Sequence, residues 1–270
     1  MPELPEVETV VRGLAPELTG RRVDAVTVHE KRLRGGVAPD FAARLTGRCI
    51  GALARRGKYL LAPLDDGRVW LVHLGMTGRL TLAAGERAAE RHDHVVVQLD
   101  DGRVVTYNDP RRFGRMAVLE PADVAQETGD GVDPLAGDFT PAFLFALSRD
   151  RRTSVKALLM DQRRVAGLGN IYVNEILFHA RIRPGRRAAR LARADCARIV
   201  RATRVVLEAA IRRGGSSISD YRDGRGREGW FQLRHRVYDR AGKPCRRCRT
   251  PVRSRSIVGR SSFYCPRCQT

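Results

Sequence analysis

The C-terminal stretch Cys245-Arg246-Arg247-Cys248, followed by Cys265-Pro266-Arg267-Cys268, carries the strongest structural signal in the chain. Two Cys-x-x-Cys pairs separated by 16 residues are typical of a site in which four thiolates bind one zinc ion and close a pair of hairpins. The alternative, two disulfides, requires an oxidising compartment that nothing else in the sequence supports. Four cysteines fill a tetrahedral site, so the metal is expected to hold structure and not to do chemistry. The sequence therefore predicts one structural Zn²⁺ at Cys245, Cys248, Cys265 and Cys268, and no organic cofactor.

The charge of the chain indicates a polyanionic partner. Its 270 residues carry 50 Lys and Arg against 30 Asp and Glu, a formal net charge of +20, and 43% of them are hydrophobic, which argues for a folded protein. Nucleic acid is the first candidate partner for such a surface, and an anionic membrane is the second. No apolar run approaches the roughly 20 residues of a spanning helix, and no signal peptide precedes the first charged residues. We therefore expect a protein of the cytoplasm with no membrane partner.

The N-terminal stretch Met1-Pro2-Glu3-Leu4-Pro5-Glu6 has two interpretations. If Met1 is removed, the ring nitrogen of Pro2 becomes a secondary amine, which can attack the C1′ carbon of a sugar and form an iminium, with Glu3 as a nearby acid. The alternative is that Pro2 only precedes a helix whose first turn contains Pro5. Residues alone favour this second interpretation.

Hydrophobic patterning divides the chain into three parts. An amphipathic helix is predicted over residues 5–18, and short β strands are predicted at 23–28, 59–64, 69–74, 95–99, 104–107 and 116–119. Leu-Asp-Asp-Gly-Arg-Val occurs twice, at 64–69 and 99–104, and each Asp-Gly step predicts a hairpin. Residues 121–140 are interpreted as a linker, and a helical pattern fills residues 140–214. We expect an α+β multidomain protein with an N-terminal antiparallel β-sandwich and its helix (1–131), a helical domain (132–223) and a segment that ends in the zinc finger (224–270, the finger from about 236).

Three further motifs have the residues needed to bind or open a nucleic acid. Residues 161–172 contain Gly167-Leu168-Gly169-Asn170, where Asn170 is expected to cap a helix whose start suits a phosphate. Loops at 73–78 and 108–114 carry the apolar Met76 and Phe113 beside an arginine, as needed to occupy a gap in a base stack. For each of these two side chains taken alone, a cap on the β core is the better interpretation. His92 and His94 lack a third metal ligand, so a phosphate contact is the more plausible role for His92.

Lysine is rare in this chain, and one lysine stands out. The four are Lys31, Lys58, Lys156 and Lys243. Because arginine keeps its proton in proteins and lysine can transfer one, Lys58 in Arg55-Arg56-Gly57-Lys58-Tyr59 is a candidate for proton transfer. A surface lysine at a strand start is an equally good interpretation of this position.

Taken together, these motifs resemble bacterial formamidopyrimidine-DNA glycosylases, of the formamidopyrimidine-DNA glycosylase/endonuclease VIII family. The resemblance runs in order along the whole chain, over residues 2–8, 56–60, 73–76, 108–114 and 167–172 and the four-cysteine finger. It implies a β-sandwich, a helix-two-turn-helix domain and a zinc finger that bind double-stranded DNA containing oxidised bases or abasic sites. It further implies a monomeric bacterial enzyme of base excision repair, located in the cytoplasm at the nucleoid, with glycosylase and DNA-(apurinic or apyrimidinic site) lyase activities.

The resemblance also implies roles for individual residues. Pro2 would be the nucleophile that forms the Schiff base, Glu3 the acid that helps to open the sugar, and Lys58 the proton donor in β-elimination, with Arg260 assigned to δ-elimination and to flanking phosphates. Met76, Arg111 and Phe113 would fill the gap left by the extruded nucleotide. The remaining matches are phosphate contacts (His92, Arg151, Asn170, Tyr238), buried supports of the amine (Glu6, Glu175) and the lid over the extruded base (Ser216, Ser217, Ser219, Tyr221).

Two departures and two alternatives accompany the resemblance. Ser219 stands where many relatives have a basic residue, and Arg249 stands where a glycine is usual. The lid departure leaves lesion preference open, although oxidised purines such as 8-oxoguanine and formamidopyrimidines are the expected substrates. An endonuclease VIII-like enzyme for oxidised pyrimidines is the nearer alternative, and a non-catalytic damaged-DNA-binding protein is the other.

Overall fold

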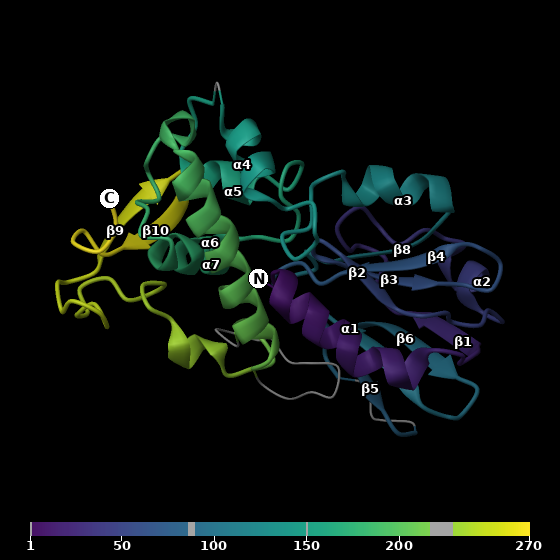
Figure 1. Ribbon diagram of the computed structural model, residues 1–270. Coiled ribbons are helices and arrows are strands. Elements are labelled where there is room, and N and C mark those ends of the chain that lie inside the picture. Colours follow the sequence, from purple (N-terminus) through teal and green to yellow (C-terminus); the bar gives the residue numbers. More distant parts are fainter. Residues whose placement is uncertain (1, 86–89, 150, 217–228) are drawn as a thin grey trace. The chain divides into compact units, whose positions relative to one another are not determined.

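The computed structural model describes residues 2–85, 90–149, 151–216 and 229–270. The chain forms two compact units (Figure 1): unit 1 contains Met1–Thr128 and Arg213–Gln232, and unit 2 contains Gly129–Arg212 and Leu233–Thr270. Among the helices of the described ranges, none combines the length and apolar character needed to cross a bilayer.

Unit 1 is a β-sandwich with a long helix at its start. Two four-stranded antiparallel sheets have the strand orders β1-β6-β7-β5 and β2-β3-β4-β8. The elements in chain order are α1 (Leu4–Leu18), β1 (Val23–Val28), α2 (Phe41–Leu45), β2 (Ala54–Arg56), β3 (Tyr59–Pro63), β4 (Val69–His73), β5 (Arg79–Ala83), β6 (Asp93–Leu99), β7 (Val104–Asn108), β8 (Arg115–Leu119) and α3 (Pro121–Thr128). The repeated hexapeptides form the predicted hairpins, because β3 pairs with β4 and β6 pairs with β7.

One apolar core joins both sheets to α1. Its helix face contributes Val7, Val10 and Leu14, which recur at helical spacing and are almost completely buried. Trp70 comes from one sheet and Tyr107 from the other, and both are 1% exposed or less. Burial of this stripe fixes the rotation and position of α1, and thereby the position of the residues just before Leu4.

The structure corrects the prediction for residues 121–140 and adds two strands. Helix α3 (Pro121–Thr128) occupies the first part of the predicted linker; among its residues only Thr128 is buried, so its sequence lacks an apolar stripe. Strand β2 has three residues, two of them arginine, which hides it from a hydrophobic pattern. Strand β5 (Arg79–Ala83) follows directly after a glycine loop and is also absent from the prediction.

Unit 2 combines a helical bundle with the cysteine finger. The helices are α4 (Pro141–Ser148), α5 (Val155–Met160), α6 (Asn170–His179) and α7 (Arg193–Ile211), with 3-10 helices η1 (Ala188–Arg190) and η2 (Phe231–Arg234), the latter where the chain passes from one unit to the other. Helix α6 packs against α5, α7 and strand β10, and α4 packs against α7. The finger hairpin consists of β9 (Arg253–Ile257) and β10 (Arg260–Tyr264), drawn in yellow in Figure 1.

Candidate functional site

The predicted nucleophile and acid lie at the start of α1. Pro2 and Glu3 are both buried and directly precede Leu4, the first helical residue. Glu6 lies in the first turn and is 1% exposed, and its Oε2 accepts a 2.9 Å hydrogen bond from the backbone N–H of Glu3. This bond satisfies one of the unpaired N–H groups of a helix start and fixes the backbone that follows Pro2.

The same carboxylate binds the beginning of the predicted lid. The backbone N–H of Ser216 donates to Oε1 of Glu6 over 2.7 Å. Gly215 has φ +80°, and a Cβ at this position would lie 2.8 Å from that oxygen, so only glycine allows the approach. Glu6 therefore holds both the N-terminal segment and the first lid residue. The other predicted lid residues, Ser217, Ser219 and Tyr221, lie outside the described residues.

Lys58 lies in the two-residue turn that joins β2 to β3, and its side chain is 8% exposed. An ion pair connects this hairpin to α1: Nε of Arg55 donates to Oε2 of Glu8 over 2.8 Å, and the Arg55 side chain is 8% exposed. Burial alone would raise the pKa of Glu8, but hydrogen bonds from Arg12 and Arg55 hold it below its usual value. The Glu8–Arg55 pair thus joins the helix that carries Pro2 to the hairpin that carries Lys58.

His73 lies directly opposite Tyr59, the residue after Lys58, on the paired strand β4. Burial, and then the positive charges of Lys58 and Arg34, lower the pKa of His73 to about 4. The imidazole is therefore neutral at physiological pH, and its Nδ1 accepts the backbone N–H of Gly75 over 3.1 Å. This hydrogen bond shapes the loop that presents Met76.

A buried carboxylate brings the two predicted gap-filling loops together. Asp109 is completely buried; its side chain accepts hydrogen bonds from the Thr77 hydroxyl (2.5 Å) in one loop and from the Gly114 N–H (2.8 Å) in the other. Gly75 has φ +62°, and a Cβ there would lie 2.4 Å from backbone atoms of Phe113 and Gly114. The structure therefore places the loops of Met76 and Phe113 in direct contact.

The outer surface of these loops is apolar and cationic. Phe113 is 43% exposed, and the guanidinium of Arg111 lies 4.7 Å from the centre of its ring. Phe113 is not among the buried residues of the apolar core of unit 1, and its role in filling a gap in the duplex stays a prediction. His92, the residue just before β6, has φ +76°, and its role as a phosphate contact stays a prediction.

The helix start in unit 2 differs in detail from the sequence prediction. Asn170 is the first residue of α6 and not its cap: Gly169 occupies the cap position, in an extended conformation. Asn170 instead accepts hydrogen bonds from the Asn174 amide, at 2.6 Å to its carbonyl. The start of α6 still presents backbone N–H groups, as an anion site requires. Arg151, another predicted phosphate contact of unit 2, is exposed.

Glu175 orders the segment that carries Tyr238. It is 1% exposed and accepts three backbone N–H groups, those of Arg236 (2.8 Å), Val237 (2.9 Å) and Tyr238 (2.9 Å). Burial raises the pKa of Glu175, and these N–H groups act in the opposite direction. Its predicted role as a support of the amine stays a prediction.

The four cysteines of the finger converge as predicted. Their sulfur atoms all lie within 4.8 Å of one another. Backbone N–H groups of Arg247 and Cys268 point at the sulfurs of Cys245 and Cys265, each over 3.4 Å, as suits thiolates that carry negative charge. The donor set fits one tetrahedral Zn²⁺. Arg249 has φ +67°, which explains why a glycine is usual at that position.

Buried polar side chains fasten the finger to the helices of unit 2. Nζ of Lys156, on α5, donates to the Ser261 carbonyl (2.8 Å) and the Ser262 hydroxyl (2.7 Å), next to Arg260 on β10. Oδ1 of Asn174, on α6, accepts the Phe263 N–H over 2.8 Å. Arg260 itself is exposed. These contacts fix the position of Arg260 relative to helices α5 and α6.

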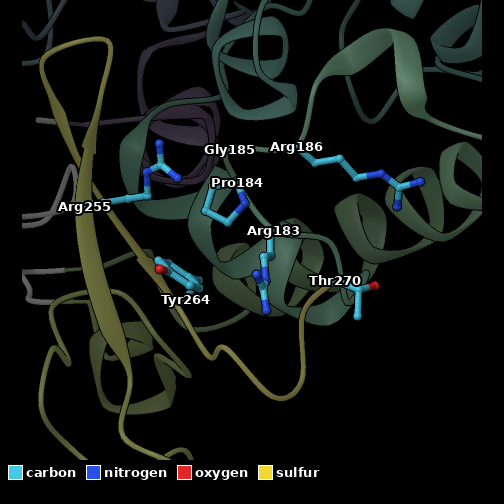
Figure 2. Close-up of a pocket in the computed structure, with 7 residues that line it drawn as sticks. All are labelled: Arg183, Pro184, Gly185, Arg186, Arg255, Tyr264 and Thr270. Carbon is cyan, nitrogen blue, oxygen red and sulfur yellow. The ribbon is translucent and has the colours of Figure 1, made fainter.

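A cavity of about 280 Å³ lies beside this junction (Figure 2). Arg255 and Tyr264 of the hairpin line one side of it, and the turn at Pro184 lines the other. Arg183 donates to the backbone oxygens of Gln269 and Pro266, both at 2.9 Å, so its charge is used to hold the end of the finger.

Comparison with known proteins identifies the family. Family models match residues 1–116 (Formamidopyrimidine-DNA glycosylase N-terminal domain), 131–222 (Formamidopyrimidine-DNA glycosylase H2TH domain) and 242–270 (Zinc finger found in FPG and IleRS). A curated formamidopyrimidine-DNA glycosylase of Thiobacillus denitrificans is 51% identical, with all of both chains covered. The chain belongs to the formamidopyrimidine-DNA glycosylase family.

Solved structures of this family share the whole fold. The crystal structure of the MutM (Fpg) protein from Thermus thermophilus is 39% identical with a TM-score of 0.88, covering 99% of this chain and 98% of that one. A Lactococcus lactis Fpg variant in complex with DNA that contains Fapy-dG is 33% identical, with a TM-score of 0.91 and full coverage of both chains.

Two features of this formamidopyrimidine-DNA glycosylase fold were missed by the sequence interpretation. Asp109 lies in the loop at 108–114, and its position between a strand and Pro110 is the signal that could have assigned it a role in shaping the loop. The Glu8–Arg55 pair had no such signal, because its members are 47 residues apart and their charges look like those of a solvated surface.

Proposed function

We propose that this protein is a bifunctional DNA glycosylase and AP lyase that removes oxidised purines, 8-oxoguanine and formamidopyrimidines, from duplex DNA in base excision repair. The observation that carries the proposal is the buried arrangement at Pro2, Glu3 and Glu6, in a chain that is similar over its full length to Fpg proteins solved with Fapy-dG and 8-oxoguanine analogue DNA. We propose that the protein acts as a monomer in the bacterial cytoplasm, at the nucleoid.

The proposed chemistry begins with Pro2 after removal of Met1. The ring nitrogen attacks C1′ of the damaged nucleotide, the bond from C1′ to the base breaks, and Glu3 protonates the ring oxygen as the sugar opens to an iminium. Loss of the C2′ proton then breaks the C3′–O bond, and a second elimination breaks the C5′–O bond. Lys58 is the proposed proton donor in the first elimination, and Arg260 is assigned to the second and to the flanking phosphates.

The remaining proposed roles are insertion into the duplex and binding of DNA phosphates. Met76, Arg111 and Phe113 are proposed to fill the gap in the duplex, since flipping a nucleotide costs a few kcal/mol of stacking and pairing that inserted side chains offset. The proposed phosphate contacts are His92, Arg151, Asn170 and Tyr238. We propose that the domain boundaries are 1–131, 132–223 and 224–270.

Borohydride trapping over a lesion panel tests the proposal. An iminium is reduced to a stable amine, so the active enzyme becomes covalently linked to a duplex that carries 8-oxoguanine. A protein that binds damaged DNA without reacting would give no adduct under these conditions and would refute the proposed activity. Thymine glycol belongs in the panel because a related Lactococcus lactis Fpg has been solved with DNA containing an oxidised pyrimidine. Faster cleavage of thymine glycol than of 8-oxoguanine would favour the endonuclease VIII-like alternative.

Replacing Arg55 by alanine is expected to slow strand cleavage roughly tenfold to a hundredfold, because the hairpin with Lys58 loses its buried link to α1 and small displacements of catalytic groups have effects of this size. Formation of the borohydride adduct should change much less. Arg12→Ala is the matched control, since Arg12 also binds Glu8 but is 65% exposed and lies on α1 itself. Equal losses in the two variants would contradict a role for Arg55 in positioning Lys58.

Duplex affinity is expected to fall steeply with ionic strength because the chain carries a net charge of +20. For six to ten phosphate contacts, release of counterions predicts a loss of about 10³–10⁵ in affinity between 50 and 200 mM salt. Titration of an abasic-analogue duplex at several salt concentrations measures this slope. A flat dependence would be inconsistent with binding through the arginine-rich surfaces.

A further inference from the structure

One hydroxyl group connects the loop of Met76 to the backbone of Arg111. Thr77 follows Met76 in the loop 74–78, between β4 and β5, and it is 9% exposed. Its hydroxyl donates to Oδ1 of Asp109 over 2.5 Å and accepts the backbone N–H of Arg111 over 3.3 Å. An ionised carboxylate can only accept and a backbone N–H can only donate, so the group between them must do both. Among small side chains, a hydroxyl has this capacity.

The carboxylate at one end of this chain of hydrogen bonds is held firmly. Asp109 is completely buried, and its second oxygen, Oδ2, accepts the Gly114 N–H (2.8 Å) and the Tyr107 hydroxyl (3.2 Å). Its backbone oxygen lies 2.7 Å from Nε2 of His94 on β6. These bonds tie Asp109 to the sheet, so a group that is bound to Oδ1 has a fixed position as well.

Arg111, at the other end, presents its side chain to solvent. It is exposed, and its guanidinium packs on the ring of Phe113, 4.7 Å from the ring centre. A long side chain that extends from the surface takes its position from its own backbone, and the Thr77 hydroxyl holds the N–H of that backbone. Thr77 therefore determines where the guanidinium lies relative to Met76, the residue next to it in the chain.

The chemistry of a guanidinium indicates which base it would favour in an opened duplex. An extruded nucleotide leaves behind a base whose pairing edge has lost its partner. Arginine offers only donors. Cytosine presents two adjacent acceptors on its pairing edge, O2 and N3, whereas adenine presents one acceptor beside a donor. A correctly placed guanidinium should therefore bind an unpaired cytosine better than an unpaired adenine.

We propose that Thr77 is a positioning residue that sets the preference of the protein for the base opposite the lesion. By holding the backbone of Arg111 against Asp109, its hydroxyl places the guanidinium where both acceptors of an unpaired cytosine can be reached. The inference rests on the proposed function, in which Met76, Arg111 and Phe113 enter the gap in the duplex.

Thr77→Val tests this role, because valine keeps the shape of threonine but can neither donate to Asp109 nor accept from Arg111. The measurement is affinity for duplexes that carry a non-cleavable abasic analogue opposite cytosine or adenine. We expect the wild-type protein to prefer cytosine, and the ratio of the two affinities to fall about threefold to tenfold in the variant, as suits the loss of one hydrogen bond. Thr77→Ser keeps the hydroxyl and should retain the wild-type ratio.

Two controls separate positioning from a general loss of structure. Thr128→Val removes the hydroxyl of another threonine of unit 1 that is 9% exposed; its hydrogen bond to the Val124 carbonyl lies within α3, so the ratio should not change. In a background of Arg111→Ala, Thr77→Val should have no further effect on the ratio, because the group that it positions is absent.

An unchanged ratio in Thr77→Val would overturn the proposal, even if affinity fell equally opposite both bases. A wild-type protein without a preference for cytosine, or an effect of Thr77→Val on the ratio that persists in the Arg111→Ala background, would overturn it too. If Thr77→Val melts at a much lower temperature, Thr77→Ala takes its place and the same ratio decides. Because these duplexes cannot react, the result is separate from borohydride trapping, whose failure would refute the glycosylase chemistry and not the role of Thr77.

Discussion

Pro2→Gly is expected to reduce base excision by at least about 10³-fold while duplex affinity stays nearly unchanged. The substitution replaces the secondary amine of the pyrrolidine ring, the proposed nucleophile, with a primary amine on a more flexible backbone, and a reacting group that is no longer held in place can lose orders of magnitude in rate. The loops of Met76 and Phe113, which we propose to contact DNA, are held by Asp109 and not by residue 2. Single-turnover excision of 8-oxoguanine, with affinity measured on an abasic-analogue duplex, provides both quantities.

Pro5→Ala is the matched control for this result. Pro5 lies in the first turn of α1, where alanine also fits, so excision should remain close to that of the wild type. Full turnover by Pro2→Gly, or by a protein that mass spectrometry shows to retain Met1, would contradict the Schiff-base mechanism.

Cys245→Ala is expected to release the zinc ion and to weaken DNA binding by roughly tenfold or more. Structural zinc sites of small domains contribute about 10–16 kcal/mol of apparent binding free energy, which the finger needs to fold. Metal analysis and titration of the same abasic-analogue duplex provide the two measurements. Cys49→Ser is the control, because Cys49 lies outside the cluster in unit 1 and is partly exposed. One zinc per chain in the Cys245 variant would refute the four-thiolate site.

The sequence was sufficient to predict those structural features that depend on residues close together in the chain. The repeated Asp-Gly hexapeptides predicted the β3–β4 and β6–β7 hairpins, since turn chemistry and alternating valines act over a few residues. Cysteine spacing predicted the metal cluster for the same reason. The family and its sandwich-plus-helical organisation are likewise confirmed.

Some features lie in segments whose own sequence pattern is weak. The three-residue strand β2 contains two arginines and pairs with β3 through a two-residue turn, and α3 forms without an apolar stripe of its own. Asn170 was expected to cap α6, but the preceding Gly169 takes that position. The Glu8–Arg55 ion pair, in contrast, joins segments 47 residues apart, so no local window of the sequence contains both partners.

Glu6 accepts hydrogen bonds from two segments that are far apart in the chain, the backbone of Glu3 and that of Ser216, which is 210 residues from Glu6. Anything that dislodges one of them removes a hydrogen bond from the carboxylate that orders the other. The two are therefore expected to gain and lose order together, so that correct placement of the N-terminus becomes a condition for correct placement of Ser216, the first residue of the predicted lid. A fusion partner left on the N-terminus would then displace Ser216 as well as block the proposed amine nucleophile.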